Sequence, residues 1–357
     1  MTSRALGWTY GINGDTLEKN YKNILSDYRS WNQKDHAEEW VLKEENPGHR
    51  LGIDETSIGN DVYTILHNKA AHGKKGAVVA MVKGTKPDDV AKIINQIPLE
   101  ERVKVTSITM DLSDSMRSIA GLCFPKARVT RDCFHVIKNC GGAIDEIRLR
   151  LKREAVKRLR KLLTGFKQKL ERLDKQRKAY KDRMKRKYGK KWRKSNRGRK
   201  PMRKNSRFTP PRLANGETLI EVLTKCSKQL LKSREKWSLY QEARAKILFK
   251  FYPKLEEAYN LINKLRSIFR STTLTKETAK VKFEEWYKEV NACTLREIKA
   301  VRDTVKFYED EILNYFIDRD TNASAESLNS KIKCFRSELK GVNDVPFFVY
   351  RVVTVLG

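Results

Sequence analysis

The chain has 357 residues, 39% of them hydrophobic, and its 76 Lys and Arg residues against 44 Asp and Glu give a formal net charge of +32. This length and apolar content allow two or three buried domain cores, and the charge predicts a polyanionic partner. No apolar run reaches the roughly 18 residues of a membrane span, and no signal peptide is visible. These features favour nucleic acid over a membrane as the partner.

Cysteine and histidine residues are scattered rather than clustered. None of the six cysteines forms a C-x-x-C pair, and the five histidines are dispersed along the chain. Isolated cysteines are typical of reduced intracellular thiols, whereas structural zinc sites need closely spaced Cys and His ligands. We therefore expect a cytoplasmic location and no structural zinc.

The N-terminal segment has a helical pattern. Large apolar side chains recur at helical spacing within residues 15–43, from Leu17 to Trp31. Pro47-Gly48 then interrupts the pattern. Because the segment is short and has no concentrated basic face, residues 1–47 are predicted to form a helical arm or linker, not a DNA-reading module.

From residue 48 the periodicity changes to that of strands. Three strands joined by short turns favour an antiparallel meander, and later strands separated by helices favour parallel crossovers. In such a mixed sheet the first and fourth strands can be neighbours, with Asp54 and Asp111 at adjacent strand ends. Residues 48–142 are thus predicted to form the first part of an α/β domain. The expected strands are 49–54, 61–67, 76–82, 102–111 and 127–132, with helices from Pro87 to about Ile97 and from Ser113 to about Cys123.

Residues 143–318 have an all-helical pattern, which begins with one long helix over 143–194. Its apolar residues from Val156 to Leu173 alternate at spacings of three and four, which is a heptad seam. Helical patterns then resume at 216–251, 254–270, 275–291 and 294–318.

The long helix and the loop after it hold most of the positive charge. Residues 148–204 contain 28 Lys and Arg against 4 Asp and Glu, a net charge of +24 in 57 residues. This concentration predicts phosphate contact, because the segment would otherwise repel itself. Trp192 would either stack on exposed bases or anchor the tip of a helical hairpin. The candidate DNA-binding residues of this flexible basic tip are Lys190, Lys191, Trp192, Arg193, Arg197 and Arg199.

Residues 319–357 are predicted to be helices that complete the α/β domain. The stretch TNASAESLNSKIK (321–333) opens a helix, for which Thr321 and Asn322 are capping residue types. Glu326 and Asn329 share a polar stripe on it, and a glutamate in a first turn can simply complement the helix dipole. Lys331 and Lys333 follow as candidate DNA contacts.

Two strand-end aspartates and one helical glutamate are the ligands that two-metal phosphoryl transfer needs. Two metal ions about 3.5–4 Å apart require carboxylates from separate elements of the chain. Hard oxygen ligands suit Mg²⁺ or Mn²⁺. Asp54, Asp111 and Glu326 are therefore the predicted catalytic and metal-binding residues, with two ions.

Four motifs, in this order, resemble those of bacterial insertion-sequence transposases of the DDE (Asp-Asp-Glu) type. They are GIDET (52–56), TMDLSDSM (109–116), RDCFHVIKN (131–139) and TNASAESLNSKIK (321–333). The resemblance implies an α/β fold with a ribonuclease-H-like mixed-sheet core, interrupted by a large, strongly basic, all-α insertion between the second Asp and the Glu. It also implies the triad Asp54, Asp111 and Glu326, and a bacterial, nucleoid-associated protein.

The same resemblance implies a supporting pair, Asp132 and His135. His135 could hydrogen-bond Asp132 structurally or take part in DNA handling, and Asn329 is a further supporting residue. The chain departs from the lineage at Ser327, where glycine is usual. It also begins without the zinc ribbon and helix-turn-helix of relatives. Either a separate end-recognition protein is then a partner, or the copy is incomplete.

The sequence thus predicts a transposase that cleaves DNA at an element's terminal inverted repeats and transfers the freed strand into target DNA. Because two ends must be brought together, a dimer or higher assembly on DNA is implied. The alternatives are a structure-selective nuclease on the same core, a non-enzymatic helical nucleic-acid-binding protein, or an inactive copy.

Overall fold

The computed structural model describes residues 3–189, 207–338 and 342–357. The chain divides into two compact units. The sheet unit comprises Met1–Lys138, Arg266–Tyr287 and Arg302–Gly357, and the helical unit comprises Asn139–Leu265 and Lys288–Val301. Within the described residues, none of the helices has the length and apolar character needed to cross a membrane.

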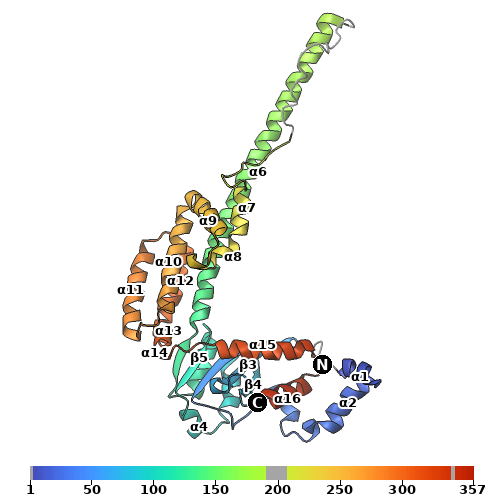
Figure 1. Cartoon of the computed structure of the whole chain (residues 1–357), viewed down its shortest axis with the longest axis vertical. Coiled ribbons are helices and arrows are strands. Elements are labelled where there is room, and N and C mark those ends of the chain that lie inside the picture. Colours follow the sequence, from blue (N-terminus) through green and yellow to red (C-terminus); the bar gives the residue numbers. More distant parts are fainter. Residues whose placement is uncertain (1–2, 190–206, 339–341) are drawn as a thin grey trace. The chain divides into compact units, whose positions relative to one another are not determined.

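A mixed sheet organises the sheet unit. In the described part of the chain it has six strands, in the order β1-β4-β3-β2-β5-β6. The pairs β1–β4, β4–β3 and β3–β2 are antiparallel. Strand β5 pairs in parallel with both β2 and β6. The predicted α/β class and the adjacency of the first and fourth predicted strands are confirmed. The strands are β1 (Trp40–Leu42), β2 (Arg50–Ile58), β3 (Asp61–Asn68), β4 (Val78–Lys83), β5 (Ser107–Met110) and β6 (Arg128–Arg131) (Figure 1).

Helices account for most of the remaining described chain (Figure 1). Those wholly within the sheet unit are α1 (Ser3–Tyr10), α2 (Gly14–Asn20), α3 (Pro87–Ile94), α4 (Leu99–Val103), α5 (Asp114–Cys123), α13 (Glu309–Leu313), α14 (Tyr315–Asp318), α15 (Ala323–Glu338) and α16 (Val345–Leu356). Those wholly within the helical unit are α7 (Leu219–Lys225), α8 (Ser227–Leu230) and α9 (Leu239–Phe251). Four helices contribute residues to both units: α6 (Cys133–Tyr188), α10 (Pro253–Arg270), α11 (Lys276–Ala292) and α12 (Arg296–Phe307).

The two faces of the sheet support separate apolar cores. Ile53 of β2 packs with residues of α3 and α5 on one face. Ile58 of β2 and Ile65 of β3 pack with residues of α15 and α16 on the other. Successive side chains of a strand point to opposite faces. Asp54, which follows Ile53, therefore lies on the face covered by α15.

The N-terminal segment is less helical than predicted. After α2 it forms short π and 3₁₀ turns, and residues 40–42 form the edge strand β1, whose Trp40 is paired with Val82 of β4. The ring of Tyr28 lies 5.1 Å from that of Phe347 in α16, centroid to centroid. The predicted helix over 15–43 is wrong because this pairing and packing outweigh the local helical spacing.

Two other predicted boundaries are also wrong. The predicted strand 102–111 is shortened to β5, Ser107–Met110, and its first two residues belong to α4. Helix α4 forms because Pro98 precedes it and two glutamates occupy its first turn, where negative charge is favourable. The predicted long helix starts at Cys133 rather than at residue 143. Gly141 lies within it, and a Cβ there would be 3.0 Å from Leu231 Cδ2, so glycine permits close packing of the helical unit.

The helical unit has its own apolar core. Val222, Leu230, Leu248 and Tyr259 are each fully buried. The predicted helix 216–251 is three shorter α-helices and a 3₁₀ turn at Arg234–Lys236. Thr218 and Ser238 each start a new helix, α7 and α9, with a capping box. The heptad residues of α6 are half-buried.

A buried ion pair stabilises this unit. Glu217, 7% exposed, accepts two hydrogen bonds of 3.0 Å from Arg244 and one of 2.8 Å from Lys225. These bonds, that of Arg244 first, lower the pKa of Glu217 to about 2. The unfolded chain would take up a proton as the pH falls below about 4.5, but the folded chain only near 2. The contribution of Glu217 to stability is therefore present above pH 4.5 and is lost as the pH falls towards 2.

We predict that Glu217→Gln lowers the free energy of unfolding by about 3 kcal/mol at pH 7, because it leaves Arg244 buried without its counter-charge. The difference from wild type should shrink as the pH falls from 4.5 towards 2. Urea unfolding followed by circular dichroism measures both. The control is Glu242→Gln, which breaks an exposed pair with Lys246 and should cost less than about 1 kcal/mol. Equal effects of the two substitutions would contradict the prediction.

Candidate active site

The parallel pairing of β2 with β5 brings two of the predicted aspartates together. Ile53 is paired with Met110, so Asp54 and Asp111 are the next residues of adjacent strands. Asp54 lies within β2, which continues to Ile58, and not at a strand end as predicted. Asp111 directly follows β5. Both aspartates are half-buried.

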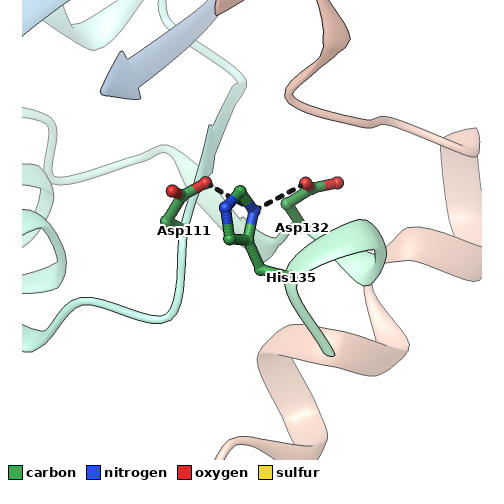
Figure 2. A group of neighbouring side chains, drawn as sticks. All are labelled: Asp111, Asp132 and His135. Carbon is green, nitrogen blue, oxygen red and sulfur yellow. Dashed lines mark hydrogen bonds and ion pairs between the residues drawn. The ribbon is translucent and has the colours of Figure 1, made fainter. Parts of the chain in front are cut away.

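A third carboxylate and a histidine complete a compact cluster. Asp132 follows β6, and His135 lies one turn further on, at the start of α6. The His135 Nδ1 atom is 3.0 Å from Asp111 Oδ1 and 3.0 Å from Asp132 Oδ2 (Figure 2). Of the two roles left open for His135, the structure shows the hydrogen bond to Asp132 and adds one to Asp111. These bonds, that to Asp111 first, raise the pKa of His135 to about 10.

Helix α15, which carries Glu326, is hydrogen-bonded to the same strands. Asn329 donates to Asp54 Oδ2 at 2.7 Å. Asn322, 1% exposed, donates to Asp111 Oδ1 at 3.3 Å and to the main-chain oxygen of Ile53 at 3.4 Å. Its side chain was predicted to cap the helix, but it contacts the aspartate instead.

Glu326 occupies the first turn of α15, one turn before Asn329. Its side chain is exposed. It does not belong to the close cluster of Asp111, Asp132 and His135, which is the one group of this kind among the described residues. The structure therefore brings the two predicted aspartates together and places Glu326 on α15, whose Asn329 donates to Asp54 and whose preceding residue Asn322 donates to Asp111.

A buried ion pair fixes the segment that leads into α15. Lys69 Nζ donates to Asp320 Oδ1 at 2.7 Å, to the main-chain oxygen of Thr321 at 2.8 Å and to Thr109 Oγ1 at 2.8 Å. Arg50 also pairs with Asp320. The segment is thus attached to β5, two residues before Asp111.

His67 of β3 attaches the first turn of α15 to the sheet. Its ring lies opposite Gly52 of β2, where a Cβ would come within 2.2 Å of His67 Cε1, so only glycine fits. The His67 Nε2 atom is 2.9 Å from Ser324 Oγ. Burial, with the charge of Lys69 adding to it, lowers the pKa of His67 to about 4. The ring is therefore neutral at pH 7.

The electrostatics of the cluster favour a cation. Burial is the main cause that raises the pKa of Asp54 to about 6; the negative charge of Asp111 adds to it, and the hydrogen bond from the Glu55 N–H opposes it. The protonated His135 supplies positive charge to Asp111 and Asp132. Closely spaced carboxylate oxygens are the ligands that Mg²⁺ and Mn²⁺ prefer. The donor set therefore fits the divalent ions predicted from the sequence.

The predicted DNA-binding residues fall into two groups. Lys331 donates to the main-chain oxygen of Gly73 at 2.7 Å, and Lys333 is exposed on α15. Lys190, Lys191, Trp192, Arg193, Arg197 and Arg199 lie outside the described residues.

Several residues of the site were not predicted. Lys69, Asp320 and His67 contact the elements that hold the carboxylates, yet nothing in their local sequence marks them. Their partners are distant in the chain: 251 residues separate Lys69 from Asp320. Buried charged residues of this kind can be recognised only once the fold is known.

Comparison with protein families gives a match over most of the chain. A family model described as Transposase (DDE_Tnp_ISL3) matches residues 51–352 of the chain. No curated protein and no solved structure matches it.

We predict that the contribution of His67 to the free energy of unfolding falls as the pH is lowered from about 6.5 to 4, so that His67→Gln gains stability relative to wild type over this interval. In that interval the unfolded chain binds a proton at His67, whereas the folded chain does not until about pH 4. Urea unfolding at a series of pH values measures the slope. The control is His49→Gln at an exposed histidine, which should keep the wild-type slope. A wild-type slope in His67→Gln would refute the prediction.

Proposed function

Given that this chain belongs to the ISL3-type family of DDE transposases, we propose that Asp54, Asp111 and Glu326 are its catalytic carboxylates. They would cleave one phosphodiester at each end of a mobile element and then join the freed 3′-hydroxyl to target DNA. The family makes DNA the partner. The assignment of residues to steps is our proposal.

One observation carries the proposal. Asn322 and Asn329, both from the segment that carries Glu326, donate hydrogen bonds to Asp111 and Asp54 respectively. These contacts hold the segment that carries Glu326 against the two aspartates of the sheet. This matches the need of metal-assisted phosphoryl transfer for carboxylates from separate elements.

Each residue has a distinct task. Asp54 and Asp111 would hold the metal ions, with Glu326 as the third carboxylate. Asn329 fixes the orientation of the Asp54 carboxylate, and Asn322 that of Asp111. Bound there, two Mg²⁺ or Mn²⁺ ions would lower the pKa of the attacking water and neutralise charge on the leaving oxygen.

DNA contact is proposed along the basic helix α6 and on α15. Phosphate contacts supply affinity and salt dependence without reading sequence. Lys333 is available for such a contact because it is exposed. We further propose that two copies act on a pair of ends and that a separate protein recognises the end sequence.

We predict that Glu326→Gln reduces Mg²⁺-dependent cleavage of supercoiled DNA carrying the element's ends by more than about 100-fold. Substitution of residues that only orient metal ligands usually lowers metal affinity or activity by about 10–100-fold. Loss of a ligand itself should lower activity by at least as much. The products should carry 3′-hydroxyl termini in wild type. The control is Glu338→Gln, at an exposed glutamate of the same helix. Equal cleavage by wild type and Glu326→Gln would remove Glu326 from the site.

We predict that replacing Lys178 and Lys181 of α6 by Gln weakens binding to any DNA sequence alike. Both lysines are exposed. Removing one lysine–phosphate interaction should reduce the slope of log K against log salt by about 1. Fluorescence anisotropy at several salt concentrations measures this slope. Replacing Lys92 and Lys126, exposed lysines of the sheet unit, is the matched control. Identical slopes for both double variants would exclude this part of α6 from the DNA path.

A further inference from the structure

A buried guanidinium lies behind the loop that carries Asp111. Arg131 is the last residue of β6, and 1% of its side chain is exposed. Its Nη1 atom donates to the main-chain oxygen of Asp111 at 3.0 Å and to that of Ser113 at 2.9 Å. A charged group is costly to bury unless its donors are satisfied. These two carbonyl groups therefore help to fix Arg131, and Arg131 fixes the loop.

The guanidinium also contacts Glu311 of α13 and Tyr308, the residue directly before that helix. Arg131 Nε donates to Glu311 Oε2 at 2.7 Å. The guanidinium carbon lies 4.2 Å from the ring centroid of Tyr308, in a cation–π contact. The Tyr308 hydroxyl donates to Asp114 Oδ1 at 2.8 Å, and Arg131 Nη2 reaches the same oxygen at 3.3 Å. One planar group therefore connects β6, the loop 111–114 and the start of α13.

A second arginine shares one of these partners through its side chain. Arg117 of α5 also pairs with Glu311, but 46% of its side chain is exposed. The main-chain N–H of Arg117 donates to the main-chain oxygen of Ser113 at 3.2 Å, a bond that substitution of its side chain leaves in place. Both arginine side chains pair with Glu311, and that of Arg131 also donates to the main-chain oxygens of Asp111 and Ser113.

We propose that Arg131 is a positioning residue for the proposed metal-binding carboxylate Asp111. Its bonds to the carbonyl oxygens of Asp111 and Ser113 set the main chain from which that carboxylate projects. The inference rests on the proposed function, since the role exists only if Asp111 binds metal. Mg²⁺ demands near-ideal octahedral geometry with oxygen ligands at about 2.0–2.1 Å, so a small shift of this loop weakens binding.

The decisive substitution is Arg131→Lys. Lysine keeps the positive charge beside Glu311 but has no planar fork to serve both carbonyl oxygens and the carboxylate together. Arg117→Lys is the matched control. Three measurements on the full chain separate the outcomes: hydrogen exchange of residues 111–117 without metal, Mn²⁺ affinity from the electron paramagnetic resonance signal of free Mn²⁺, and DNA affinity.

In Arg131→Lys we expect faster exchange of residues 111–117 and an Mn²⁺ dissociation constant raised about 10–100-fold, the usual cost of losing a group that orients a metal ligand. DNA affinity should not change, and Arg117→Lys should match wild type throughout. Exchange at the wild-type rate in Arg131→Lys would overturn the proposal. Faster exchange with unchanged Mn²⁺ affinity would also overturn it, because Arg131 would then be only a structural residue.

Two further results are informative. If Arg131→Lys does not fold, as judged by circular dichroism, Glu311→Gln tests the same contact by removing the carboxylate that holds the guanidinium. It should show the same changes to a smaller extent, and wild-type behaviour would overturn the proposal. If wild type itself fails to bind Mn²⁺, the proposed function fails and the role of Arg131 with it. If wild type binds Mn²⁺ but the variants behave like wild type, only the role of Arg131 is overturned.

Discussion

The in-register parallel pairing of β2, β5 and β6 is the constraint on which the site depends. Ile53 is paired with Met110, and Met110 with Arg131. Adjacent strands are about 4.8 Å apart. The residues that directly follow Ile53, Met110 and Arg131 are therefore close to one another. A slip of one residue would turn an aspartate to the opposite face. Apolar packing on the far face, which includes Ile53 and Met110, therefore sets the position of three acidic groups. These are Asp54, Asp111 and Asp132.

The negative charge of carboxylates held this close together has to be compensated. The sheet unit compensates it with buried or half-buried cationic side chains. His135 lies between Asp111 and Asp132, and Lys69 binds Asp320 at the entrance to α15. Arg131 acts on the main chain of the same loop rather than on the Asp111 carboxylate. An acidic centre is thus embedded in a chain whose formal net charge is +32. This combination suits a polyanionic substrate, which the basic surface attracts and metal ions at the acidic centre would neutralise.

Prediction from sequence succeeded where local pattern and packing agree. The meander and α5 with its Ser113 cap were recognisable, because alternation and capping act over a few residues. It failed where a distant partner decides. Strand β1 exists because β4 pairs with it, although the apolar residues before it, from Leu17 to Trp31, have helical spacing. The side chain of Asn322 is a capping type, yet it turns to an aspartate 211 residues away.

The sequence by itself determined the chemical class of this protein. Its charge, the order of its four motifs and its strand pattern indicated a transposase with an α/β core, and the family match and the mixed sheet agree with that. Only the tertiary structure decided which residues support the acidic cluster. Arg131, Lys69 and His67 make contacts that no spacing rule encodes, since hydrogen-bond geometry selects partners by distance in space. Local patterns reflect neighbours within about one helical turn or strand pair, whereas a buried charge is satisfied by whichever segments the fold brings to it.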